Sequence, residues 1–203
     1  MPSVYDIKPR FQALLRPLVR RMARAGIRAN QVTVAAMLLS LLVGLVVGCA
    51  AGGQRWVWAL LPLWLLLRMA LNAIDGMLAR EHGQASRLGA VLNELGDVVA
   101  DAGLYLPLAL TPWFSLWPLA VFVLLAQMTE MAGVIGLQIG AARRYDGPLG
   151  KSDRALVFGV LGLLFALGVP GGQWLDGLVW LLALLCALTV LNRARAALRE
   201  SGP

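Results

Sequence analysis

Cysteine and histidine are scarce in this chain of 203 residues. It contains two cysteines, Cys49 and Cys186, and one histidine, His82. The cysteines lie in separate apolar segments without a pairing pattern, so we interpret both as small buried hydrophobic residues and exclude a disulfide framework and redox chemistry. His82 follows Arg80 and Glu81 in a polar turn, where a surface histidine is more common than a metal ligand. The sequence also has no internal repeat of fixed period.

Apolar residues are abundant instead. They make up 59% of the sequence, which exceeds the apolar content of a soluble domain. The mean hydropathy is +0.73. We therefore expect a single all-α membrane domain over residues 1–203. A spanning helix needs about 20 apolar residues. Six segments are candidates and would form a six-span bundle over residues 32–195: 32–51, 56–79, 89–110, 116–139, 155–169 and 174–192.

The segment before these spans, residues 4–25, interleaves apolar and basic residues at helical spacing. This pattern predicts an amphipathic helix that lies on the cytoplasmic surface of the membrane. Pro9 and Pro17 predict breaks in that helix. A basic tail without such a helix is the alternative interpretation.

Basic residues are distributed unevenly along the chain. Sixteen of the 18 Lys and Arg residues lie in the N-terminal arm, the 80–88 turn, the 140–154 loop or the C-terminal tail, and the exceptions are Arg55 and Arg68. The positive-inside rule then predicts a multi-pass protein of the bacterial cytoplasmic membrane with both termini in the cytoplasm. The net charge of +7 lies in short loops beside spans, which indicates contact with anionic lipid head groups and argues against nucleic-acid binding.

Polar residues recur at fixed spacing in the second and third predicted spans. They are Asn72, Asp75, Gly76, Ala79, Arg80, Gly89, Asn93 and Asp97. Three- and four-residue steps place positions 72, 75, 76 and 79 on one face of the first helix and positions 93, 97 and 101 on one face of the next, with Arg80 one position from the first face. An aspartate at the bilayer centre costs about 3 kcal/mol, so these side chains are expected to face a wet cavity, a cation or both. Oxygen ligands of this kind suit Mg²⁺ or Mn²⁺, and an arginine at the cytoplasmic end suits a phosphate. The pattern predicts a metal-bridged phosphate site that opens to the cytoplasm.

This spacing resembles the signature of the CDP-alcohol phosphotransferase (CDP-alcohol phosphatidyltransferase class-I) family, D-x2-D-G-x2-A-R-x8-G-x3-D-x3-D. Asparagine stands here at the first and third acidic positions, 72 and 93, so the chain resembles a bacterial subgroup with that variation. Asn30 and Thr33, next to the first span, resemble a further element of the family. The six-span layout matches as well, so the resemblance covers nearly the whole chain.

The resemblance implies an enzyme of phospholipid biosynthesis. Such an enzyme moves a phosphatidyl or other phosphoryl-alcohol group from CDP-diacylglycerol, or a related CDP-alcohol, to the hydroxyl of an acceptor alcohol and releases CMP. The resemblance also implies a homodimer and divalent ions, Mg²⁺ or Mn²⁺, with two ions expected and one as the alternative. By position it assigns the metal to Asn72, Asp75, Asn93 and Asp97, and the catalytic base to Asp97. The positions near the CDP moiety are Asn30, Thr33, Gly76, Arg80 and Ser86.

The two asparagines lower the formal charge of the four acidic positions from −4 to −2. Glu94 or Asp101 is expected to supply the missing charge, and Asp101, one turn beyond Asp97, is a further metal candidate. The alternatives are a single metal, metals that arrive with the donor's diphosphate, or an inactive relative. Lys151 and Arg154 are either phosphate or acceptor contacts or simply topology charges.

A transporter or cation-binding membrane protein is the alternative function of a different class, because intramembrane acids also line permeation paths. That function requires polar residues that continue to the external face. The third predicted span ends instead in alternating leucines over 104–110. Glu130, in the fourth predicted span, is either a functional acid or the partner of Arg68 across the bundle.

Overall fold

The computed structural model describes the backbone of residues 4–201 and the side chains from Arg10 onward. Within residues 4–201 every regular element is a helix and there is no strand, which confirms the all-α expectation. The elements are α1 (Val4–Arg24), α2 (Ala29–Ala50), η1 (Arg55–Ala59), α3 (Leu60–Glu81), α4 (Arg87–Tyr105), η2 (Leu106–Leu110), α5 (Leu116–Gln138), α6 (Lys151–Ala166) and α7 (Trp174–Ser201), where η marks a short 3-10 helix.

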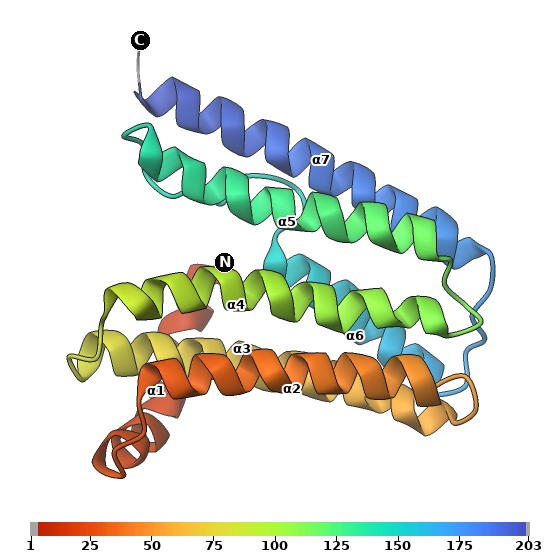
Figure 1. Ribbon diagram of the computed structural model, residues 1–203, viewed down its shortest axis with the longest axis horizontal. Coiled ribbons are helices and arrows are strands. Elements are labelled where there is room, and N and C mark those ends of the chain that lie inside the picture. The colour runs from red at the N-terminus through yellow and green to blue at the C-terminus, as the bar shows by residue number, and fades with distance from the viewer. Residues whose placement is uncertain (1–3, 202–203) are drawn as a thin grey trace.

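The helices form two groups that run along a common direction (Figure 1). Helix α2 packs against both α3 and α4, and α3 also packs against α6. Helices α5 and α7 lie side by side in the second group. The 82–86 turn and the C-terminus lie at one end of the bundle, and the 51–54 and 167–173 connections lie at the other (Figure 1). Helix α1 packs against α3 near the 82–86 turn, where Arg16 pairs with Glu81.

Over residues 4–201, four helical segments are long and apolar enough to cross a membrane. They are Ala29–Ala50, Arg55–Glu81, Leu116–Gln138 and Trp174–Ser201. Helix α4 has 19 residues but carries Glu94, Asp97 and Asp101, and α6 has 16 residues. The structure therefore supports a multi-pass membrane protein. Helix α6 begins at Lys151, four residues before the predicted span, because its first turn is polar and carries no apolar signal.

Helix α1 is continuous over Val4–Arg24, so the expectation of breaks at its two prolines was wrong. Proline removes one helical hydrogen bond, but contacts with α3 hold this helix. Val19 is fully buried in a cluster with Ile74 of α3. Arg16 donates two hydrogen bonds of 3.1 Å to the Glu81 carboxylate. Tertiary packing thus outweighs the local preference.

Both cysteines are free, as expected, but only Cys186 is buried. Cys49 is exposed on the outer surface of α2, so its expected burial was wrong. Helix α2 packs with the face that carries Gly44 and Gly48, and Cys49 lies about 100° around the helix from Gly48. Apolar composition alone could not show which face of α2 meets its neighbours.

Helices α2 and α4 approach each other closely at Gly44. A Cβ atom placed on Gly44 would lie 2.0 Å from the backbone oxygen of Gly103. We expect Gly44→Ala to push the helices apart and destabilise the protein by about 1–3 kcal/mol, the usual cost of overpacking. Thermal unfolding in detergent should show a lower midpoint. Gly177→Ala is the control, because its added Cβ would meet no atom within 4 Å. Equal midpoints for the two variants would contradict this packing.

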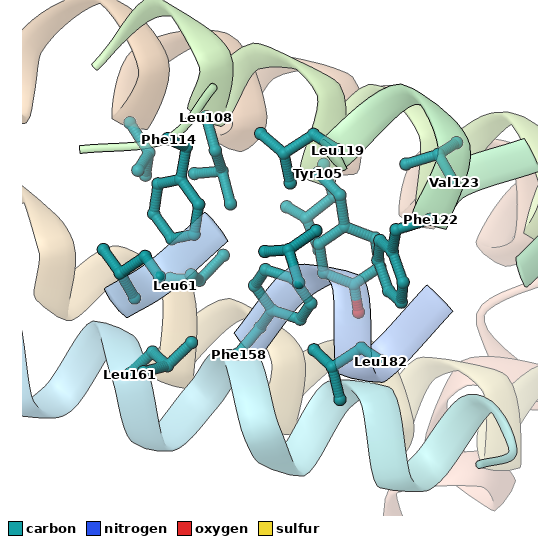
Figure 2. Packing of buried hydrophobic residues seen from close by; sticks show 14 of the residues in the cluster. Leu61, Tyr105, Leu108, Phe114, Leu119, Phe122, Val123, Phe158, Leu161 and Leu182 are labelled. Carbon is teal, nitrogen blue, oxygen red and sulfur yellow. The ribbon is translucent and has the colours of Figure 1, made fainter. Parts of the chain in front are cut away.

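An apolar core fills the bundle beyond the polar residues of α4. Tyr105, Phe122 and Phe158 contact one another there (Figure 2), and the rings of Tyr105 and Phe158 have centroids 4.4 Å apart. Leu104 and Leu108 are fully buried in the same cluster. Helix α4 thus passes from polar side chains to a closed apolar core.

Candidate active site

Three residues from two helix starts meet at the end of the bundle that holds the 82–86 turn. Ser86 caps α4, and its hydroxyl accepts a hydrogen bond of 2.9 Å from the backbone N–H of Gly89. A Cβ on Gly89 would lie 2.7 Å from Oδ1 of Asn30 and 3.0 Å from Oγ of Ser86. Glycine at position 89 therefore lets both side chains approach the first turn of α4. The structure brings together two of the residues predicted to lie near the CDP moiety.

Thr33 and Asp75 join α2 to α3. Thr33 Oγ1 donates a hydrogen bond of 2.8 Å to Oδ2 of Asp75. The Asp75 residue is only 5% exposed. Among the side chains that the structure describes, no basic group forms an ion pair with it. A buried carboxylate without a cation is costly. Asp75 is therefore a candidate ligand for a cation.

Arg80 lies over Gly76. A Cβ on Gly76 would lie 3.1 Å from both terminal nitrogens of Arg80, so the guanidinium folds back across that glycine. The residue is exposed, and within residues 10–201 no acid pairs with it. Its fork of N–H donors is therefore available to a phosphate.

Asp97, the predicted base, is contacted by two cations. Its Oδ1 accepts a hydrogen bond of 3.3 Å from Nη2 of Arg68 and forms an ion pair with Nζ of Lys151. The same nitrogen of Arg68 lies 3.3 Å from the backbone oxygen of Asp97. Arg68 thus joins α3 to α4, and Lys151 joins α4 to α6.

Asp101 lies one turn further along α4, between two arginines. Its Oδ1 accepts from Arg68, and its Oδ2 accepts from Arg154 at 3.1 Å. Arg154 is fully buried and also donates to Oε1 of Glu130 at 3.1 Å and to Oγ1 of Thr129 at 3.1 Å. Both oxygens of Asp101 are taken by arginines, and Arg154 presents no exposed atom to a phosphate.

The acids Glu94 of α4 and Glu130 of α5 are also paired with arginines. Glu130 pairs with Arg154 and, at 3.9 Å, with Arg193, so the expected pair between Glu130 and Arg68 is not formed. Glu94 pairs with Arg143. Glu94 and Asp101, the residues expected to compensate for the two asparagines, are therefore neutralised by arginines.

A pocket of about 420 Å³ opens beside Asp97. It is lined by Asn93, Asp97, Glu130, Arg143, Tyr145, Gly150, Lys151, Ser152, Asp153 and Arg193. The sequence analysis missed Tyr145 and Arg193. The only available signal for them was their position in the basic segments near the spans.

The 139–150 loop folds back onto α5 and α7 and closes one side of this pocket. Arg144 donates from its backbone N–H to the Gly133 oxygen at 3.2 Å, and Arg193 Nε donates to the Asp146 oxygen at 3.3 Å. Hydrogen bonds from the Arg144 guanidinium lower the pKa of Asp146 below its usual value. Arg144 pairs with Glu200 as well. The charge of Arg144 therefore stabilises the loop through these two ion pairs.

The described part of the chain contains no group of three or more Asp, Glu, His or Cys side chains close enough to bind a metal. The candidate ligands are two carboxylates, Asp75 and Asp97, and two half-buried amides, Asn72 and Asn93. All four offer hard oxygen donors, which Mg²⁺ and Mn²⁺ prefer. Together with the uncompensated charge of Asp75, this donor set fits a divalent cation.

Comparison with known protein families identifies the family of this chain. A model of the CDP-alcohol phosphatidyltransferase family matches residues 27–192. The chain belongs to this family. The match confirms the resemblance seen in the motif, and it makes the protein a transferase of the CDP-alcohol phosphatidyltransferase type.

Individual relatives agree with this assignment. The inner membrane protein YnbA of Escherichia coli K12 is 45% identical over 200 residues, which is 98% of each chain. The phosphatidylinositol phosphate synthase of Mycobacteroides abscessus is 28% identical over 198 residues, 95% of this chain and 87% of its own.

Solved structures share the fold. The crystal structure of Mycobacterium tuberculosis phosphatidylinositol phosphate synthase with CDP-DAG bound matches with a TM-score of 0.74 at 21% identity, over 89% of this chain and 92% of that one. The complex of the same enzyme with manganese and citrate gives a TM-score of 0.73 at 21% identity, over 89% and 87%.

Proposed function

We propose that this protein transfers a phosphatidyl or related phosphoryl-alcohol group from CDP-diacylglycerol, or another CDP-alcohol, to the hydroxyl of an acceptor alcohol and releases CMP. The proposal is carried by three contacts among the signature residues: Asn30 and Ser86 meet at Gly89, Thr33 donates to Asp75, and Arg80 folds across Gly76. These are the family positions for the CDP moiety and the metal. The CDP-DAG-bound mycobacterial structure supports the choice of donor.

We propose Mg²⁺ or Mn²⁺ as the cofactor, held by Asp75 with Asn72, Asn93 and Asp97 as the remaining candidate ligands. When bound, a divalent ion withdraws charge from the phosphoryl oxygens and orients the leaving group. The manganese in the mycobacterial complex supports this choice of metal. Arg80 supplies a further positive charge to the donor's diphosphate.

The transfer itself requires a base and a place for the acceptor. The acceptor oxygen forms a bond to the phosphorus of the phosphatidyl group while the bond to CMP breaks, and the CMP oxygen keeps the electron pair. We assign the acceptor's proton to the carboxylate of Asp97. Arg68 fixes that carboxylate by holding both its Oδ1 and the backbone oxygen of the same residue. The pocket beside it, lined by Lys151 and Arg193, receives the acceptor.

The apolar core argues against the transporter alternative. Leu104, Tyr105 and Leu108 are almost completely buried beyond Asp101 on the same stretch of chain. A permeation path would have to cross this packed cluster (Figure 2). The polar site therefore serves as a pocket with one open side.

We propose six spans, with α4 and α6 as the two that hydropathy and length do not identify. The outer face of α4 exposes Leu88, Val91, Leu95 and Val99. Its 19 residues extend about 28 Å, close to the hydrocarbon thickness of about 30 Å. Next to α6 the chain packs against protein, where the Leu149 N–H donates to Oγ1 of Thr189, and irregular backbone is tolerated in such a position.

The orientation follows from the basic residues, and α1 lies on the cytoplasmic surface in this arrangement. A Cys49→Ala, Cys186→Ala background with Asp146→Cys should react with a membrane-impermeant maleimide only after spheroplasts are lysed. Gly53→Cys, at the opposite end of the bundle, is the matched control and should react in intact spheroplasts. Labelling of position 146 before lysis would reverse the proposed topology. The homodimer stays a prediction.

The experiment that tests the function uses purified protein with CDP-diacylglycerol and a panel of polyols and phosphorylated alcohols. CMP should appear with at least one acceptor, and mass spectrometry of the lipid product identifies that acceptor. Absence of CMP with every donor and acceptor would favour the inactive-relative alternative.

A further inference from the structure

The two carboxylates of the signature lie in different electrostatic surroundings. Asp75 is buried and has no ion pair among the described side chains. Asp97 already has the Lys151 ammonium and the Arg68 guanidinium at one oxygen. Of the two, only Asp97 forms an ion pair with a basic side chain.

We infer that this site holds one divalent ion, at Asp75, and that the ammonium group of Lys151 takes the place of a second ion beside Asp97. This inference rests on the proposed function, and it makes Lys151 a catalytic residue. It also explains how asparagine is accommodated at positions 72 and 93, since one ion needs fewer carboxylates than two.

The charges of the site agree with one ion. Asp75, Asp97 and the donor's diphosphate contribute four negative charges, and a divalent ion, Arg80 and Lys151 contribute four positive ones. A second divalent ion would leave an excess of two positive charges in surroundings of low dielectric constant, where such an excess is costly. Arg68 is outside this set, because its charge is matched by the buried Asp101.

The backbone holds Lys151 in position for this role. Lys151 is the first residue of α6, and the Gly150 N–H before it donates a hydrogen bond of 2.8 Å to Oδ2 of Asp153. The Lys151 side chain is 28% exposed and lines the same pocket as Asn93 and Asp97. Its ammonium therefore faces the space where the acceptor meets the phosphoryl group.

The test is a titration of the purified wild-type protein with Mn²⁺ alone, followed by electron paramagnetic resonance. We expect one Mn²⁺ per chain, and Asp75→Asn should remove it. The triple variant Asn72→Asp, Asn93→Asp, Lys151→Ala restores the four acids and removes the competing cation, so it should bind two ions that show mutual spin coupling. Arg195→Ala, an exposed change on α7, is the control and should bind one.

Activity gives a second readout. Lys151→Ala should lower kcat for CMP release by about a hundredfold, the usual effect of removing one electrostatic stabiliser, and should leave Mn²⁺ binding at one ion per chain. Lys151→Arg should retain more activity because it keeps the charge.

Two Mn²⁺ ions of similar affinity in the wild type, or none, would overturn the inference, and this outcome needs no variant to fold. An unchanged kcat in Lys151→Ala would also overturn it. Either result with CMP still released would leave the proposed function in place, whereas a protein that binds one Mn²⁺ but releases no CMP would refute the proposed function itself.

Discussion

Asp97→Asn should lower the rate of CMP release by at least about a hundredfold, the low end of the effect of losing a general base. The amide keeps the size of the side chain and can still accept a hydrogen bond from Arg68, but it cannot take the acceptor's proton. Steady-state kinetics with saturating CDP-diacylglycerol measures the loss as a fall in kcat. The variant should unfold at nearly the wild-type temperature, since Asp97 is only partly buried.

Two further variants make this result specific. Asp176→Asn, the same chemical change at the opposite end of the bundle, should leave kcat nearly unchanged. Asp101→Asn should act mainly on stability, because it removes the negative charge between Arg68 and Arg154. If Asp101→Asn folds normally and loses turnover while Asp97→Asn does not, the base lies one turn further along α4.

Removal of divalent metal should have an effect of at least the same size. A bound ion contributes several kcal/mol to transition-state stabilisation, which corresponds to about a hundredfold or more in rate. We expect excess EDTA to stop CMP release and added Mg²⁺ or Mn²⁺ to restore it. The physical reason is the buried carboxylate of Asp75, with which no basic side chain in the described part of the chain forms an ion pair.

The control for this experiment is EDTA added with an equal amount of Mg²⁺, which tests the chelator without removing the metal. Asp75→Asn should be inactive at every metal concentration because it removes the charge that binds the ion. Undiminished CMP release in metal-free buffer with excess EDTA would show that the reaction proceeds without a divalent ion.

The motif on α3 and α4 could be predicted from the sequence because helical periodicity fixes which residues share a face. That prediction led to the family, which the family model confirmed. The all-α architecture followed from apolar content in the same way. Local rules were weaker where packing competes with them: α1 continues through its prolines because Val19 is buried against α3.

The partners of the buried charges could not be predicted. Whether Glu130 meets Arg68 or Arg154 depends on the rotation of several helices about their axes, which the sequence does not display. The burial of individual basic side chains could not be predicted either. Lys151 and Arg154 are separated by less than one helical turn, yet the Lys151 side chain is 28% exposed and that of Arg154 is 0% exposed. Only the packed structure distinguishes a cation that faces the pocket from one enclosed by Asp101 and Glu130.

The most direct test of phosphoryl-alcohol transfer is the stoichiometry of its products. Purified protein is incubated with CDP-diacylglycerol, Mg²⁺ and the acceptor found in the panel, and CMP and the new phospholipid are quantified together. We predict equal amounts of the two products, both lost in Asp97→Asn. CMP accompanied only by phosphatidic acid would indicate hydrolysis of the donor, and no CMP with any acceptor would contradict the transferase function of this chain.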